Sequence, residues 1–175
     1  MKRKYLLVAV ISAALAMALA ACSGESLPST DEPVVVTAVD YGFEGLPERV
    51  KVGTTLALEN ESMVELHELV AIRLPDDEDR SIDDLVQLPP DEFAAFFPGL
   101  ATVVIAPPGA EGFVVEGTGT LSEPGRYAVI CAIPTGANPD EYLAAAAESD
   151  GEPPQVAGGP PHLAMGMYGE ITVVE

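Results

Sequence analysis

Residues 124–136 read PGRYAVICAIPTG, an apolar, strand-like run that follows a Pro-Gly turn and carries a cysteine at its end. Similar apolar runs recur through the chain from Val34 onward, separated by clusters of Gly, Pro, Asn and Asp. Many short strands divided by such turns predict an all-β fold, either a sandwich or a barrel. The expected strands cover residues 34–39, 49–52, 54–60, 65–74, 101–106, 111–121, 126–133 and 169–174.

Two stretches, residues 76–100 and 138–161, interrupt the strand pattern. In the first, Ser81 precedes IDDLVQL with Asp84 three residues later, and Asp91 precedes EFAAFF, which are signals of helix starts. The second begins with the helix-favouring DEYLAAAAE and ends in a Pro/Gly-rich loop. We expect both to be short helical insertions on the surface of the sandwich.

The N-terminus carries targeting signals rather than a part of the fold. A basic start is followed by an uncharged apolar run, and Leu19-Ala20-Ala21-Cys22 resembles a bacterial lipobox, in which the cysteine is lipidated. An ordinary secretory signal with an incidental cysteine is the alternative. The prediction is a signal peptide over 1–21, a lipid-anchored tether over 22–33 that begins at Cys22, and a domain over 34–175. The domain then faces away from the cytoplasm of a bacterial cell, held to the membrane by lipid alone.

The chain is strongly acidic, with 28 Asp and Glu against 8 Lys and Arg. Cleavage before Cys22 removes three of the basic residues and leaves a formal net charge of −23. Such a chain is not expected to bind nucleic acid phosphates. The charge could orient a partner protein with a basic docking surface, or it could serve solubility alone.

The cysteines and histidines are few enough to be informative. If Cys22 carries lipid, Cys131 has no intramolecular partner, and an unpaired thiol in an exported protein is easiest to sustain when it is buried or bound to metal. The chain has two histidines, His67 and His162, and Met167 follows the second one. A thiolate, two imidazoles and a thioether are the donors that select copper in a trigonal site with a long axial methionine. Taken one at a time, each of these four residues could also be an ordinary packed side chain with no metal.

Taken together, these features resemble the cupredoxins, the family of small blue-copper β-sandwiches. The similar segments are VKVGTTLALENES (50–62), HELVAI (67–72), PGRYAVIC (124–131) and HLAMGMYGEITV (162–173). The resemblance implies a Greek-key β-sandwich fold. It also implies one type 1 copper ion with His67, Cys131 and His162 in the equatorial plane and Met167 as the axial ligand. Met165 has a poorer spacing from His162.

Two features depart from the family pattern. Cys131 and His162 are 31 residues apart, whereas only a few residues separate them in simpler cupredoxins, although long loops cost little closure entropy. Glu68 stands where plastocyanin-like members often have an asparagine that ties the first ligand strand to the cysteine loop. The resemblance therefore does not predict that contact here.

The function that these features favour is electron transfer with a redox partner protein, and not catalysis. A multicopper oxidase needs further histidine ligands, and the chain has no histidine besides His67 and His162. A nucleophilic Cys131 would need an exposed thiol of low pKa. Two alternatives stay open: copper storage or delivery through the same ligands, and a metal-free binding module of the same fold. In the second case the three principal ligands would lie apart.

Overall fold

The computed structural model describes residues 32–148 and 153–175. The predicted signal peptide over 1–21, Cys22 and nearly all of the tether over 22–33 therefore lie outside the described residues. Within the described ranges, no helix is long and apolar enough to cross a membrane.

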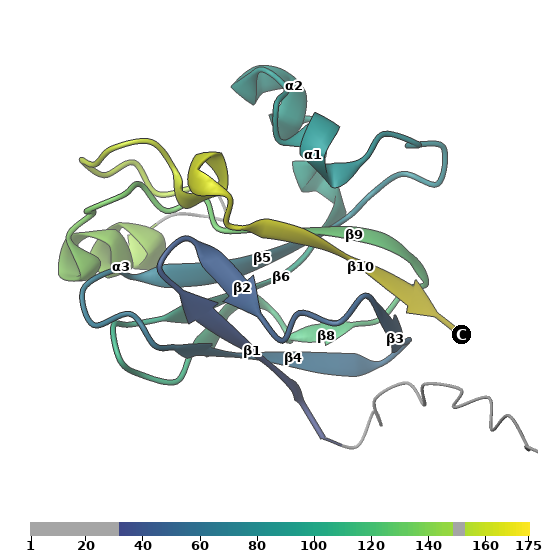
Figure 1. Ribbon diagram of the computed structural model, residues 1–175, viewed down its shortest axis with the longest axis horizontal. Coiled ribbons are helices and arrows are strands. Elements are labelled where there is room, and N and C mark those ends of the chain that lie inside the picture. The colour runs from purple at the N-terminus through teal and green to yellow at the C-terminus, as the bar shows by residue number, and fades with distance from the viewer. Residues whose placement is uncertain (1–31, 149–152) are drawn as a thin grey trace, which may run out of the picture.

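In the part of the chain that the structure describes, ten strands form two sheets. The sheets pack face to face, as Figure 1 shows, which confirms the predicted all-β sandwich. The smaller sheet has the order β2-β1-β4-β8 and the larger one β3-β10-β9-β5-β6-β7. The order β9-β5-β6-β7 is that of a Greek key, because β5, β6 and β7 follow one another and β9 returns beside β5. The strands are β1 (Val34–Val39), β2 (Gly42–Glu44), β3 (Arg49–Lys51), β4 (Thr54–Asn60), β5 (His67–Arg73), β6 (Leu100–Ala106), β7 (Phe113–Gly117), β8 (Thr120–Leu121), β9 (Gly125–Ile130) and β10 (Tyr168–Val174).

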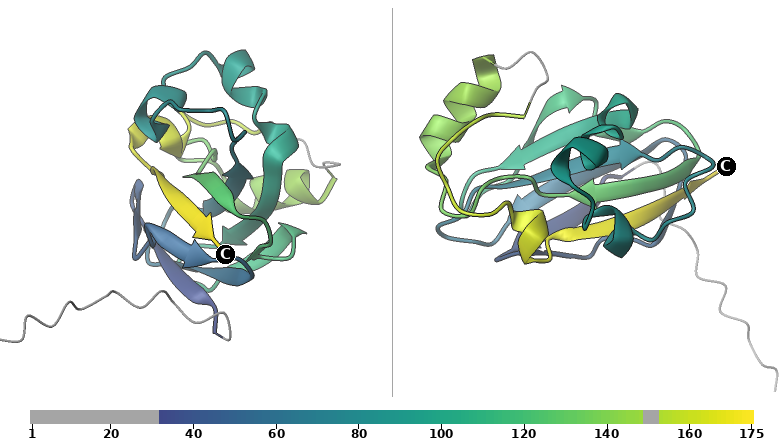
Figure 2. Two further views of the ribbon diagram at one scale, coloured as in Figure 1. Left: turned by 90° about the vertical axis from the view of Figure 1, so that its right-hand side faces the viewer. Right: turned by 90° about the horizontal axis from the view of Figure 1, so that it is seen from above.

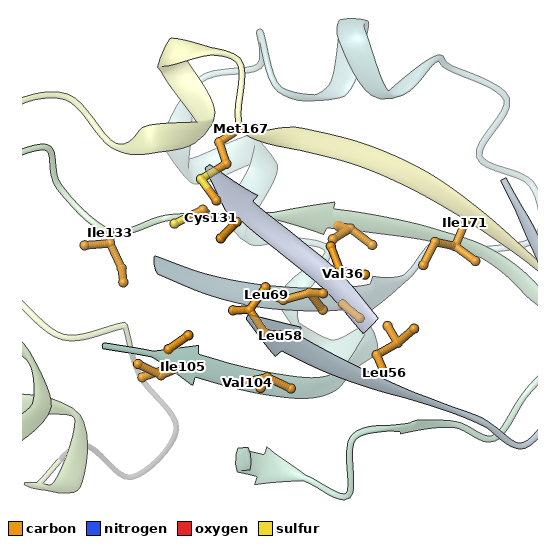
Figure 3. Packing of buried hydrophobic residues seen from close by; sticks show 14 of the residues in the cluster. Val36, Leu56, Leu58, Leu69, Val104, Ile105, Cys131, Ile133, Met167 and Ile171 are labelled. Carbon is orange, nitrogen blue, oxygen red and sulfur yellow. The ribbon is translucent and has the colours of Figure 1, made fainter. Parts of the chain in front are cut away.

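The main core lies between the two sheets. Leu56 and Leu58 of β4 alternate with more exposed neighbours, and both are buried against side chains of the larger sheet such as Leu69 and Ile171. Figure 3 shows these side chains filling the space between the layers, with Cys131 at one end of the cluster. The period-2 alternation that predicts the strands is thus also what builds the core.

The first insertion covers the outer face of the larger sheet. It holds α1 (Ile82–Leu85), α2 (Pro90–Ala94) and the 3₁₀ turn η1 (Phe97–Gly99), and Figure 2 shows them lying across the strands. Leu85 and Phe93 are buried there against outward side chains of β5 and β9, including Val70. The predicted short helical insertion is confirmed for these residues, and it also gives the sheet a second apolar layer, which was not predicted.

The helix starts are partly as predicted. Ser81 caps α1 by accepting a hydrogen bond from the backbone N–H of Asp84. The second helix begins at Pro90 and not after Asp91, because proline at the first helical position has its φ already set for a helix. The second insertion contains α3 (Pro139–Glu148), and a further 3₁₀ turn, η2 (His162–Met165), precedes β10.

Strand β2 was not expected from the sequence, which suggests only a turn between residues 40 and 48. It pairs with β1 through a tight turn in which Tyr41 has φ of 65°, a left-handed conformation that is uncommon for a residue other than glycine. The three residues of β2 are too few to show a period.

The alternation in β1 and β4 predicts that inward and outward positions differ in how much they contribute to stability. Leu58→Ala empties a site that is 1% exposed, so we expect it to lower the free energy of unfolding by about 2–5 kcal/mol. Val35→Ala, on an exposed position of β1, should change it by less than ~0.5 kcal/mol. Urea denaturation of both variants measures this, and equal losses would contradict the assignment of faces.

Candidate metal centre

Three potential ligands from separate parts of the chain meet at one end of the core. His67, Cys131 and His162 are each fully buried, and their ligand atoms all lie within 4.8 Å of one another. The two Nδ1 atoms are 3.2 Å apart, and the Sγ of Cys131 lies 3.3 Å from Nδ1 of His162. The structure therefore brings together the three equatorial ligands that the sequence predicts.

The strand alternation explains how two of these side chains reach the same place. His67, Leu69 and Ala71 lie on the core face of β5, while the residues between them face outward. Cys131 directly follows β9, which pairs antiparallel with β5. It comes two residues after the inward Val129, so its side chain lies on the same face of the sheet. Neighbouring strands thus deliver an imidazole and a thiol to one face of one sheet.

The long gap between Cys131 and His162 is closed by backbone pairing. Pro134 and Pro161 form an isolated antiparallel bridge, and next to it the N–H of Thr135 donates to the carbonyl of Pro160 at 3.0 Å. A side chain at Gly159 would collide with Thr135, so glycine allows the two chain segments to approach. The second insertion therefore leaves and rejoins the sandwich at one point, so its length does not keep Cys131 and His162 apart.

Met167 is placed beside the cluster by a glycine turn. Gly166 ends η2 with φ of 108°, a left-handed conformation that turns the chain from the histidine into β10. Met167 is fully buried, and its carbonyl accepts a hydrogen bond from the N–H of Cys131 at 3.1 Å. Figure 3 shows the two sulfur-bearing side chains together, whereas Met165 is 52% exposed. Met167 is therefore the buried methionine next to Cys131, and Met165 is the exposed one.

Burial keeps the three donors neutral in the metal-free protein. Desolvation, together with His162, lowers the pKa of His67 to about 4, and desolvation also lowers the pKa of His162. Desolvation raises the pKa of the Cys131 thiol, with a smaller contribution from Glu68. A nucleophilic cysteine needs the opposite shift, so this site does not suit a Cys/His hydrolase. A metal bound here would have to displace the thiol proton.

The donor set fits a trigonal copper site. Three ligand atoms placed about 2 Å from a common centre in one plane are roughly 3.5 Å apart, which is close to the two short separations found here. The two Nδ1 atoms face each other and are the nitrogens available to a shared metal. Both Nε2 atoms point away from this centre and are buried without a hydrogen-bond partner among the described residues. Two imidazoles and a thiolate with a nearby thioether are the donors that suit copper.

Glu68 links the first ligand strand to the loop that carries Cys131. It does so through its backbone N–H and its carboxylate, in place of the asparagine amide of plastocyanin-like members. Its backbone N–H points at the Sγ of Cys131 at 3.4 Å, and its Oε1 accepts from the N–H of Ala132 at 3.1 Å. Its Oε2 accepts from the hydroxyl of Tyr142 at 3.0 Å. Desolvation raises the pKa of this buried carboxyl to about 7. The contact that the resemblance could not predict is therefore present.

Three neighbours of the site were missed by the sequence reasoning. Tyr142 comes from α3, Tyr41 meets the ring of His162 edge-on at a centroid distance of 5.2 Å, and Glu65 Oε2 lies 3.5 Å from His162 Nε2. Only Glu65 carried a signal, since it lies two residues before the first ligand. The tyrosines come from segments that were expected to be turn and surface helix.

Comparison with solved structures finds similarity to auracyanins. The dithionite-reduced auracyanin of Roseiflexus castenholzii is 19% identical with a TM-score of 0.45, over 84% of this chain and 98% of that chain. Auracyanin A of Chloroflexus aurantiacus, described as a blue copper protein, is 16% identical with a TM-score of 0.41, over 82% and 98%. A copper-containing nitrite reductase of Thermus scotoductus is 18% identical with a TM-score of 0.36, over 82% of this chain and 23% of that one.

No family model matches the sequence, and no curated protein matches it.

The link between Glu68 and Tyr142 predicts an effect on stability. Tyr142→Phe leaves a buried carboxyl oxygen without its partner, so we expect the metal-free protein to lose about 1–3 kcal/mol of its free energy of unfolding. Tyr168→Phe removes a hydroxyl that donates to the exposed Asp83, and should cost no more than ~0.5 kcal/mol. Urea denaturation compares the two. Equal costs would mean that the buried hydrogen bond is not important.

Proposed function

We propose that this protein is an electron carrier that binds one copper ion through His67, Cys131 and His162, with Met167 as the axial ligand. The observation that carries the proposal is the meeting of two imidazole nitrogens and a thiol sulfur, all fully buried, at one point of a rigid sandwich. When bound, copper would supply a one-electron couple between Cu(I) and Cu(II).

The residues around this point are suited to a carrier because they are held from several sides. Backbone hydrogen bonds join Cys131 to Met167 and Leu163, and another joins His162 to Ile133. The backbone of Cys131 and of His162 is therefore held in position without a metal. Donors that need not move when the charge at the centre changes by one favour fast electron exchange.

Burial favours electron transfer over copper storage or delivery. A delivery site must hand its ion to another protein, which requires donors that a partner can reach. All three principal donors and Met167 have no exposed surface. A metal-free binding module is disfavoured because the same three side chains converge instead of lying apart.

We further propose that the domain is held by lipid at Cys22 on the outer face of a bacterial membrane, after cleavage of residues 1–21. The lipobox-like sequence and the basic, then apolar, segment before it support this. The acidic charge supports a redox partner with a basic docking surface, because complementary charge speeds and orients encounter.

The copper site is tested by visible absorption. The full-length chain, purified in detergent and given Cu(II), should show a strong band near ~600 nm from copper–thiolate charge transfer, as expected of a type 1 site. Cys131→Ser should lose the band, whereas Ser122→Ala, which removes an exposed hydroxyl outside the ligand set, should keep it. A colourless protein that still binds Cu(I) would favour storage or delivery, and binding of neither ion would refute a copper site.

The two methionines provide a matched pair for the axial position. Met167→Leu removes a thioether that would stabilise the more highly charged metal, so the reduction potential should rise. Met165→Leu changes an exposed side chain and should leave the potential as it is. Potentiometric titration of both variants decides this, and a shift with Met165→Leu alone would move the assignment to that residue.

The lipid anchor is tested by metabolic labelling with a fatty acid in a bacterial host. The wild-type chain should carry label and sediment with membranes, because acyl chains add favourable burial in the bilayer. Cys22→Ser should be unlabelled and should leave the membrane fraction. Label retained in Cys22→Ser would show that another residue is modified.

A further inference from the structure

A carboxylate lies against the outer edge of the second histidine, and the ligand set does not account for it. Oε2 of Glu65 is 3.5 Å from Nε2 of His162. This is longer than the roughly 2.7–3.2 Å of an ordinary N–H···O hydrogen bond, so the contact acts mainly through charge. The His162 side chain is fully buried and that of Glu65 is 14% exposed, so solvent screens the pair only weakly.

Glu65 is itself fixed by three segments of the chain. Its carboxylate accepts from the N–H of Gly136, at 3.1 Å to Oε2 and 3.3 Å to Oε1, and the hydroxyl of Tyr41 lies 3.5 Å from Oε1. Its own N–H donates to the hydroxyl of Ser62 at 3.0 Å. A carboxylate held by the loop after Cys131 and by the β1–β2 turn cannot easily move away from the histidine.

The position of this carboxylate bears on which ring nitrogen of His162 carries the proton. A negative charge beside Nε2 favours N–H there and leaves Nδ1 with a free lone pair. That lone pair faces Nδ1 of His67 and the Sγ of Cys131, the two atoms with which it would share a metal. In the metal-free protein, Nδ1 of His67 must then be the donor toward His162, which agrees with its Nε2 lacking a partner.

We propose that Glu65 is the positioning residue of His162: its carboxylate holds the imidazole in the tautomer that presents a bare Nδ1, and its charge favours the higher oxidation state of a metal bound there. The second half of this inference rests on the proposed copper function, whereas the first half does not. Glu65 also covers the ring edge together with Tyr41, which is why the second histidine has no exposed surface.

Three variants separate charge, hydrogen bonding and simple loss of an acid. Glu65→Gln keeps an oxygen that can accept from Gly136 and His162 but removes the charge. Glu65→Ala removes both. Glu61→Gln removes one charge from an exposed residue of the same β4–β5 connection, and is the matched control.

The first measurement is nitrogen NMR of the histidine rings in the metal-free, full-length protein. We expect His162 to carry its proton on Nε2 in the wild type and in Glu61→Gln. Glu65→Gln, which keeps an oxygen acceptor but loses the charge, should populate the Nδ1–H tautomer in part. Glu65→Ala should populate the Nδ1–H tautomer as well. A proton on Nδ1 in the wild type, or no change in Glu65→Ala, would overturn the positioning role whether or not the protein binds copper.

The second measurement is the reduction potential of the copper-loaded protein. Glu65→Gln should lower the ratio of Cu(II) to Cu(I) affinity about tenfold, which raises a one-electron potential by about 59 mV. Glu61→Gln should give a much smaller shift, because its charge is exposed and screened. Equal shifts in the two variants would overturn the charge effect. If the wild type shows no copper–thiolate band, the copper function fails instead, and the ring tautomers still decide the role of Glu65.

Discussion

Two imidazole nitrogens and a thiol sulfur face one another at about 3.2–3.3 Å in a part of the core with no exposed surface. Polar atoms are costly to bury unless something satisfies them, and here both Nε2 atoms lack hydrogen-bond partners among the described residues. A protein that needed these positions only for packing would be more stable with apolar side chains there. The two Nδ1 atoms and the Sγ, which face one another, are the atoms that a shared metal ion would take.

The rest of the fold serves to keep those donors in place. β5 and β9 are buried on both faces, by the core on one side and by the first insertion on the other, which leaves the ligand strands little freedom. The second insertion supplies Tyr142, which holds Glu68 from behind the ligand strand. Both insertions thus support the site from the outer face of the larger sheet, although neither contributes a ligand.

The sequence predicts much of this because two of its signals are local. Alternation of apolar residues in TTLALEN and RYAVIC defines strands and faces together, and the few histidines leave little choice of ligands. The contacts of Glu65 with Gly136 and of Glu68 with Tyr142 join residues more than 70 positions apart. No local pattern encodes such pairs, so they become visible only when the strands are assembled. The burial of the first insertion was missed for a similar reason, since its apolar residues show no clear period.

The two carboxylates beside the site have opposite roles. Glu68 is enclosed, and desolvation raises its pKa to about 7, so near neutral pH it carries only part of a full negative charge next to the thiol. Glu65 lies at the rim with its carboxylate held by a backbone N–H and close to His162. A negative charge near the sulfur would compete with a thiolate, whereas one beyond the imidazole polarises the ring toward a metal. The enclosed acid near the thiol and the rim acid beside the imidazole therefore match what a thiolate–imidazole metal centre requires of its surroundings.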